Sequence, residues 1–187
     1  MPNSLPNPKE LRKLLEYNPA TGKLFWLERT PDWFSDGRQS AEHTCRRWNT
    51  RYAGKEAFTS KDKDGYSKGS IFRCDFRAHR VIWAMAHNDW PPETIDHING
   101  VKDDNRIENL RAVTHIENLK NQKLPSSNTS GHMGVCWRPN SSNWEAQIKV
   151  NGRQIYLGRY VKKDDAIAAR KAAEVNYGYH VNHGRTL

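Results

Sequence analysis

The feature that most limits the fold of this chain is a polar break at residues 121–130. This stretch reads NQKLPSSNTS and has no regular apolar spacing, so it cannot bury one face of a helix or a strand. The chain has 187 residues, which leaves a short segment on either side of the break. We therefore expect two small cores instead of one large one, joined by a linker at 124–130.

Composition and charge narrow the class of protein. Seven Trp and seven Tyr are too many aromatic residues for a disordered chain. The formal net charge is +9, with basic residues spread through the chain, which favours nucleic acid as the partner. The sequence has no apolar run of about 18 residues and no secretory signal, so we expect a cytoplasmic protein without a membrane partner.

Short helices and strands are expected before the break. Residues 29–50 show no clear period and are assigned as loop with some local structure. Asp64-Gly65 is a strong turn dipeptide and is expected to join two strands. The other predicted elements are a helix at 9–16, a strand at 24–28, strands within 52–76 and a helix at 78–87.

Asp96 and His97 are the first candidates for catalysis. They follow the apolar Ile95 and precede the turn dipeptide Asn99-Gly100, so the pair is expected near the end of a strand. An unperturbed histidine has a pKa of about 6.5 and can take a proton from water at neutral pH. His97 is therefore the candidate general base.

A helix is expected to follow this pair. Thr114 and Glu117 have the spacing of a capping box, which predicts that the helix begins at about residue 115. Asn118 then lies in its first turns, able to face back toward the strand, whereas His115 is expected to point outward. The carboxylate of Asp96 and the amide oxygen of Asn118 are hard oxygen ligands. The expected cofactor is therefore Mg²⁺ or Mn²⁺, one ion in each active site, and not zinc.

The motif DHINGVKDDNRIENLR, with GY and AHRVIW before it, resembles the HNH endonuclease family, above all the HNH enzymes of phages and mobile introns. The resemblance covers about 52–121 and implies a ββα-metal fold. It also implies that Asn109 is the asparagine that the middle letter of the name HNH denotes, which braces the loop and helps to orient the catalytic histidine. Asn118 stands at the position of the second histidine in that name, where asparagine is a common substitute. The alternative is that these asparagines only close turns, as we expect for Asn99 and Asn105.

Basic residues near the motif are candidate contacts to DNA phosphates. Arg106, Arg111, Lys120 and Lys123 surround the motif, and each could equally be only a solvated charge. Arg80 at the start of the helix predicted at 78–87 could also reach a phosphate, although an arginine in such a position often only pairs with a carboxylate.

After the break, three short alternating strands and an alanine-rich helix are expected. Asn151-Gly152 predicts a hairpin turn between the second and third strands, and Asp164-Asp165 begin the helix. The pieces GVCWR, WEAQI, YLGRY and DAIAAR resemble the plant AP-two (ethylene-response-factor) DNA-binding domain over 128–180. In that family the three-stranded sheet enters the major groove of DNA. The contacts that the resemblance implies are Arg138, Gln147, Lys149, Arg153 and Tyr156.

Together these features predict an α+β chain with a ββα-metal nuclease core and a three-stranded antiparallel sheet packed on one helix. The predicted function is a metal-dependent DNA endonuclease of a nicking or homing type, acting on double-stranded DNA as a monomer or weak dimer. Two alternatives stay open: a non-catalytic DNA-binding regulator on the same scaffold, and a nuclease for RNA or branched DNA. The predicted domains are an N-terminal accessory segment at 1–51, the nuclease at 52–123, the linker at 124–130 and the DNA-binding domain at 131–187.

Overall fold

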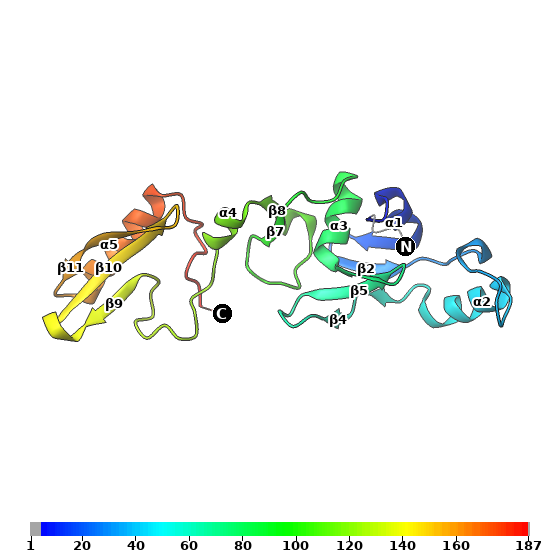
Figure 1. Ribbon diagram of the computed structural model, residues 1–187, viewed down its shortest axis with the longest axis horizontal. Coiled ribbons are helices and arrows are strands. Elements are labelled where there is room, and N and C mark those ends of the chain that lie inside the picture. The colour runs from blue at the N-terminus through cyan, green and yellow to red at the C-terminus, as the bar shows by residue number, and fades with distance from the viewer. Residues whose placement is uncertain (1–4, 187) are drawn as a thin grey trace. The chain divides into compact units, whose positions relative to one another are not determined.

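The chain folds into short helices and small antiparallel sheets, which confirms the expected α+β class (Figure 1). The computed structural model describes residues 5–186, apart from the side chains of His115 and Ile116. The outward orientation expected for His115 therefore lies outside the described residues. No helix in the described range is long and apolar enough to cross a membrane.

The residues group into two compact units. The first unit contains the chain up to His97 and Val101–Ala112, and the second contains Ile98–Gly100 and the chain from Val113 onward. This boundary falls inside the segment predicted as one nuclease domain, 52–123. The predicted domain limits were drawn from sequence motifs, whereas these two units are defined by contacts in the fold. The predicted limits therefore stay predictions.

An apolar core holds the first unit together, and α3 (Ala78–His87) contributes most of its helical part. This helix has the bounds predicted from the sequence. Leu11 and Leu14 join the same core, so the N-terminal segment predicted as an accessory is part of the unit's interior. The remaining elements of the unit are α1 (Pro8–Leu14), β1 (Leu15–Asn18), β2 (Lys23–Trp26), η1 (Pro31–Trp33), α2 (Ala41–Tyr52), β3 (Glu56–Ala57), β4 (Ser60–Lys61), β5 (Ser67–Ile71), β6 (Cys74–Arg77), β7 (Thr94–His97), η2 (Ile107–Asn109) and β8 (Leu110–Val113), whose last residue is counted with the second unit.

Three small sheets carry these strands. β1, β2 and β3 form one antiparallel sheet, β4, β5 and β6 form another, and β7 pairs with β8. The turn predicted at Asp64-Gly65 is confirmed between β4 and β5, where Gly65 has a φ of +87° that glycine adopts without strain. The helix expected at 9–16 ends at Leu14, because Leu15 is extended and pairs with Trp26 of β2.

The region 29–50, assigned as loop, instead contains most of the twelve-residue helix α2. Ser40 begins this helix by accepting a hydrogen bond from the backbone N–H of His43. The helix buries only Cys45 fully, and its other inward residues are large or polar. Its apolar stripe is too thin for the sequence to show the helical period.

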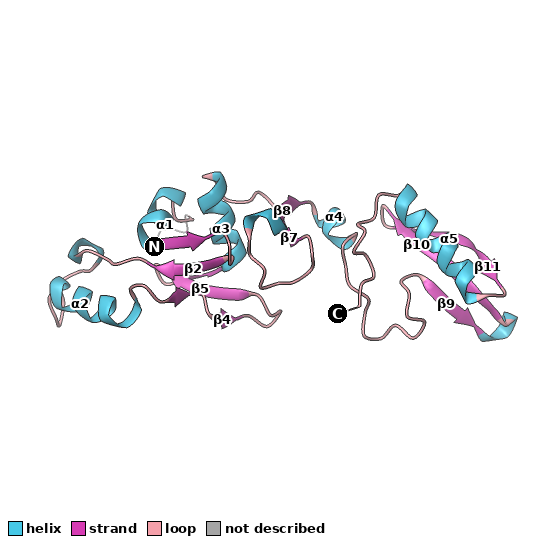
Figure 2. Cartoon of the chain, turned by 180° about the vertical axis from the view of Figure 1, so that it is seen from behind, coloured by secondary structure: helices cyan, strands magenta, loops and turns pink. Residues whose placement is uncertain are grey.

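The second unit contains the three-stranded antiparallel sheet on one helix that the sequence predicted (Figure 2). The strand order is β11-β10-β9, and Val135, Ala146 and Ala166 form the buried centre between the sheet and α5. The predicted hairpin turn is confirmed, since Asn151 and Gly152 both have positive φ angles. The elements are α4 (His115–Leu119), β9 (Val135–Arg138), η3 (Pro139–Ser141), β10 (Asn143–Val150), β11 (Arg153–Tyr160) and α5 (Lys163–Asn176).

The polar break is tied to the C-terminal residues of the same unit. The backbone N–H of Leu124 donates to the carbonyl oxygen of Arg185 at 3.0 Å, and that of Gly184 donates to Gln122 at 2.8 Å. Nη1 of Arg185 also donates to the carbonyl oxygen of Asn121 at 2.6 Å. The first residues of the polar break are therefore held in place by hydrogen bonds to the C-terminal residues.

Candidate active site

β7 delivers Asp96 and His97 to the interior of the first unit. Both residues are polar yet buried, with exposed fractions of 8% and 3%. The strand ends at His97, as predicted, and the turn that follows uses Gly100 at a φ of +74°. Buried polar groups need hydrogen-bond partners, so the partners of these two side chains define the site.

Asn105 holds the imidazole of His97. The amide oxygen of Asn105 lies 2.9 Å from Nε2 of His97, and Asn105 is itself buried. An amide oxygen only accepts hydrogen bonds, so Nε2 carries the proton and the lone pair of the neutral ring lies on Nδ1. The sequence indicated only a turn-closing role for Asn105, because nothing in a run of Asp and Asn residues marks one of them as buried.

The surroundings of His97 keep its ring neutral. Burial lowers the pKa of His97, while the bond to Asn105 acts in the opposite direction. The ring of His79 lies 5.2 Å away in an edge-to-face contact, and burial lowers the pKa of His79 to about 3. Tyr66 packs against both imidazoles. A neutral imidazole in such a setting is able to accept a proton.

Arg111 on β8 holds the carboxylate of Asp96. Its Nε and Nη2 lie 3.0 and 2.8 Å from the same oxygen, Oδ2 of Asp96. A buried carboxylate is stable only with such a partner, because desolvation penalises an unpaired charge. Arg111 was predicted to contact a DNA phosphate. The structure places it on Asp96, with a third of its side chain exposed, and the DNA contact stays a prediction.

The residues at this point fit a hard divalent cation. Within residues 5–186, no group of three His, Cys, Asp or Glu side chains could hold a metal ion alone. The carboxylate of Asp96 is a hard oxygen donor, of the kind that Mg²⁺ or Mn²⁺ takes together with several water ligands. Asn118 lies half-buried on α4 of the second unit, behind the capping box of Thr114 and Glu117 that the sequence predicted. Its partnership with Asp96 is a proposal.

The loop between β7 and β8 is braced by its own side chains. Nδ2 of Asn109 donates to the carbonyl oxygen of Asp104 at 2.7 Å. Arg106 forms two bonds of 2.7 Å to the carboxylate of Asp104. These contacts fix the segment that carries Asn105, so the acceptor for His97 has a defined position.

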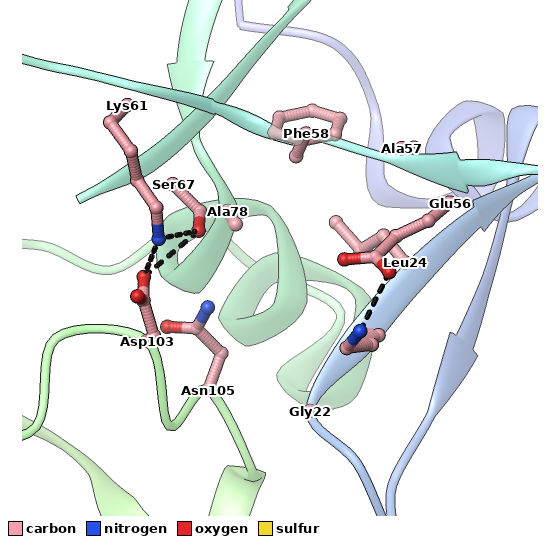
Figure 3. A pocket seen from close by; sticks show the side chains of 11 residues that line it. Gly22, Leu24, Glu56, Ala57, Phe58, Lys61, Ser67, Ala78, Asp103 and Asn105 are labelled. Atoms are coloured by element: carbon pink, nitrogen blue, oxygen red, sulfur yellow. Dashed lines mark hydrogen bonds and ion pairs between the residues drawn. The ribbon is translucent and has the colours of Figure 1, made fainter.

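A cavity of about 250 Å³ borders the same loop, with Asp103 and Asn105 in its wall (Figure 3). Lys61 and Ser67 bind the carboxylate of Asp103, as the dashed lines in the figure show. Lys61 holds the pKa of Asp103 below its usual range. The wall is therefore a paired polar network that supports the loop from the side of the β4-β5-β6 sheet.

The predicted phosphate contacts near the motif have partners within the protein. Arg80 donates to the carbonyl oxygens of Glu93 and Pro91 at 2.9 and 3.3 Å. Arg106 pairs with Asp104, as described above. In the second unit, Nζ of Lys120 donates to the carbonyl oxygen of Tyr177 at 2.8 Å. All three cations keep part of their surface exposed, and their DNA contacts stay predictions.

In the second unit, four of the five predicted DNA contacts share one face of the sheet. Gln147 and Lys149 are two residues apart on β10, and Tyr156 of β11 lies opposite Gln147. Arg138 of β9 reaches the same face, where it meets Glu145 of β10. Arg153 lies on the opposite face, since it is three residues from Tyr156 along the same strand.

Glu145 organises the cations on that face. Its carboxylate lies 2.7 Å from Nη2 of Arg138 and 3.3 Å from Nε of Arg159. The bond from Arg138 is the main cause that lowers the pKa of Glu145. The sequence did not single out Glu145 or Arg159, because their opposition is visible only once β10 and β11 are paired.

Comparison with known proteins shows which sequences this chain resembles. A stretch of 79 residues is 35% identical to Protein 3.8 of Escherichia phage T7 and covers 42% of this chain and 65% of that protein. No solved structure matches the chain. Residues 76–120 match the model of the HNH endonuclease family, and this range includes Asp96, His97, Asn109 and Asn118. The chain therefore carries an HNH endonuclease domain at residues 76–120.

Proposed function

We propose that the protein is a divalent-metal-dependent DNA endonuclease with its catalytic centre at Asp96 and His97. One observation carries this proposal. The buried Asp96-His97 pair, with the imidazole held by Asn105, lies inside the segment that matches the HNH endonuclease model. A scaffold without chemistry does not require a buried histidine beside a buried carboxylate, because both groups cost free energy to desolvate.

His97 acts as the general base for the attacking water. Its Nε2 proton is committed to Asn105, so the proton of the water goes to Nδ1. Burial keeps the ring neutral at physiological pH and so keeps the lone pair on Nδ1.

Asp96 and the amide oxygen of Asn118 would hold one Mg²⁺ or Mn²⁺ ion. Such an ion supplies a Lewis acid for the phosphate and stabilises the departing 3′ oxygen. Arg111 orients the carboxylate of Asp96 through Oδ2. Asn109 braces the loop that carries Asn105. One centre in each chain favours cutting one strand at a time.

The sheet of the second unit is proposed to bind the same double-stranded DNA, as the AP-two resemblance implies. Residues 128–187 carry nine basic and four acidic residues, which complements a polyanion. Tyr156 and Lys149 are exposed on the face that α5 does not cover. Replacing both with alanine is expected to weaken duplex binding without changing the rate of cleavage at saturating DNA.

One observation favours a second candidate function, a DNA-binding regulator that keeps the HNH scaffold without catalysis. Arg111 occupies Oδ2 of Asp96, an oxygen that a metal ion would otherwise take. In this alternative the ion pair is permanent and only structural. The protein would then bind duplex DNA and cleave none.

Nicking of supercoiled plasmid DNA tests the proposed function. The wild type is compared with His97→Ala in Mg²⁺, Mn²⁺ or EDTA, and His87→Ala serves as the control because His87 is an exposed histidine of the same unit. We expect metal-dependent nicking by the wild type and the control, and none by His97→Ala. Duplex binding without cleavage by the wild type in either metal would replace the nuclease with the regulator.

A further inference from the structure

α2 presents a cationic face that the proposed active site does not use. A helix turns by roughly 100° per residue, so positions 43, 46, 47, 50 and 51 fall within an arc of about 140°. All five residues, His43, Arg46, Arg47, Thr50 and Arg51, are exposed. Residues 38–55 carry five basic residues and one acidic residue, so this short segment supplies four of the nine net positive charges.

The opposite face of α2 is fixed to the rest of the first unit. Asn49 exchanges two hydrogen bonds with the backbone of Arg29, accepting from its N–H at 3.0 Å and donating to its carbonyl oxygen at 2.9 Å. The Arg29 guanidinium lies 3.8 Å from the centre of the Trp48 ring, and Trp48 meets Trp26 edge to face. These contacts fix the rotation of α2 about its axis, so its cationic face has a defined direction.

The arginines on this face differ from Arg106 and Arg111 of the candidate active site. Within residues 5–186, none of Arg46, Arg47 and Arg51 forms an ion pair with a carboxylate. Arg47 donates to the side chain of Gln39 at 3.1 Å, and Arg51 packs beside the Tyr52 ring. By contrast, Arg111 and Arg106 are held by carboxylates at about 2.8 Å. The α2 face therefore keeps its full charge for an external anion.

We propose that the α2 patch, defined as Arg46, Arg47, Thr50 and Arg51, binds the phosphate backbone of duplex DNA. The inference rests on the proposed function, which makes DNA the substrate of the nuclease unit. Guanidinium groups donate paired hydrogen bonds to phosphate oxygens. The hydroxyl of Thr50 donates to the carbonyl oxygen of Arg46 at 2.9 Å, so the arginines supply the donors and Thr50 is a small residue between them. Phosphate contacts position a duplex without reading its sequence. The patch thus holds the substrate on the nuclease unit, independently of the sheet in the second unit.

Salt-dependent binding measures the number of phosphates that the patch neutralises. The probe is a short fluorescein-labelled duplex of random sequence, titrated in EDTA with the His97→Ala background so that no cleavage occurs. Each phosphate contact contributes about 0.9 to the slope of log Kd against log salt concentration. We expect Arg46→Gln with Arg51→Gln to lower that slope by about 1.8, and Arg46→Lys with Arg51→Lys to retain it.

The matched control is Lys9→Gln with Lys13→Gln. These lysines are exposed on α1 of the same unit, and the double change removes the same net charge. We expect the control to keep the wild-type slope. Thr50→Glu adds a negative charge in the middle of the patch while leaving every arginine in place, so it is expected to weaken binding even if the double arginine variant does not fold.

Two results would overturn the inference. One is an arginine double variant and a Thr50→Glu variant, both folded by circular dichroism, that bind the duplex with the slope of the lysine control. The other is a loss confined to a single-stranded RNA probe of the same length. Because this assay needs no cleavage, an inactive plasmid assay with an intact α2 effect rejects only the nuclease, whereas active cleavage with no α2 effect rejects only the patch.

Discussion

Replacing Asn105 with alanine tests whether its amide holds His97 for catalysis. The change removes the acceptor 2.9 Å from Nε2 of His97, and the two residues are only 4% and 3% exposed. A buried donor left without its partner costs about 1 to 3 kcal/mol of folding free energy. If roughly 1 to 2 kcal/mol of this bond also acts in the transition state, kcat for plasmid nicking falls about 5- to 30-fold.

The pH dependence of kcat separates orientation of the base from simple destabilisation. Burial lowers the pKa of His97, and the bond to Asn105 opposes that shift. Without the bond the pKa falls further, so the acidic limb of the profile moves to lower pH in Asn105→Ala. Asn105→Asp keeps the acceptor and adds a negative charge beside the ring, so its acidic limb moves to higher pH.

Asn18→Ala is the matched control for these variants. Asn18 closes a turn in the same unit by accepting from the backbone N–H of Ala20, so its loss is expected to lower stability and leave the acidic limb in place. If Asn105→Ala nicks DNA at the wild-type rate, or slows it while all four proteins share one acidic limb, Asn105 does not orient the base.

Three further predictions follow from the same site and its surroundings. Asp96→Ala is expected to weaken Mn²⁺ binding by about tenfold or more in electron paramagnetic resonance titrations. Arg111→Met removes the cation from Oδ2 of Asp96 and is expected to strengthen Mn²⁺ binding. Equal Mn²⁺ affinities in the wild type and both variants would exclude Asp96 as a ligand. His79 has a pKa of about 3 in the fold against 6.5 when free, so it contributes fully to stability above pH 6.5 and loses up to about 1.4 kcal/mol for each unit that the pH falls toward 3. Urea unfolding at several pH values is expected to show a shallower loss in His79→Gln, and a parallel loss would contradict this assignment. Arg73 has a φ of +66° in the exposed turn between β5 and β6, so Arg73→Gly is expected to raise the free energy of unfolding by about 0.5 to 1 kcal/mol, and a fall would show that the Arg73 side chain makes up for its strain.

The position of Asp96 and His97 at the end of a strand was predictable because several local signals coincide there. An apolar residue, an acid, a histidine and a turn dipeptide occur in sequence, and the capping box of Thr114 and Glu117 marks the helix that follows. The helix at 78–87 was predictable for a similar reason, since its buried residues repeat at helical spacing. Each of these features is decided by residues close together in the chain.

The role of Asn105 and the presence of α2 were not predictable from local sequence patterns. Asn105 depends on a contact with His97 in the folded loop, and α2 is anchored by residues of different chemical types. His97 selects Asn105 among neighbouring polar residues only when the loop folds back over β7. α2 is anchored by one cysteine, one asparagine and one tryptophan, of which Asn49 and Cys45 bind the backbone carbonyl of Arg29. Such an anchor has no apolar period for a sequence pattern to detect.

Arg111 and the arginines of the α2 patch differ in how strongly the fold depends on them. A guanidinium that stabilises a buried carboxylate cannot be removed without leaving that charge unpaired, so Arg111 is bound to the fold before any substrate arrives. The arginines of the α2 patch carry no such obligation, since the helix is held by Asn49 and Trp48 on its other face. Removing them is therefore expected to change binding and not folding. This difference in coupling, which charge counts along the sequence cannot reveal, makes the α2 patch the better test of whether the first unit binds DNA.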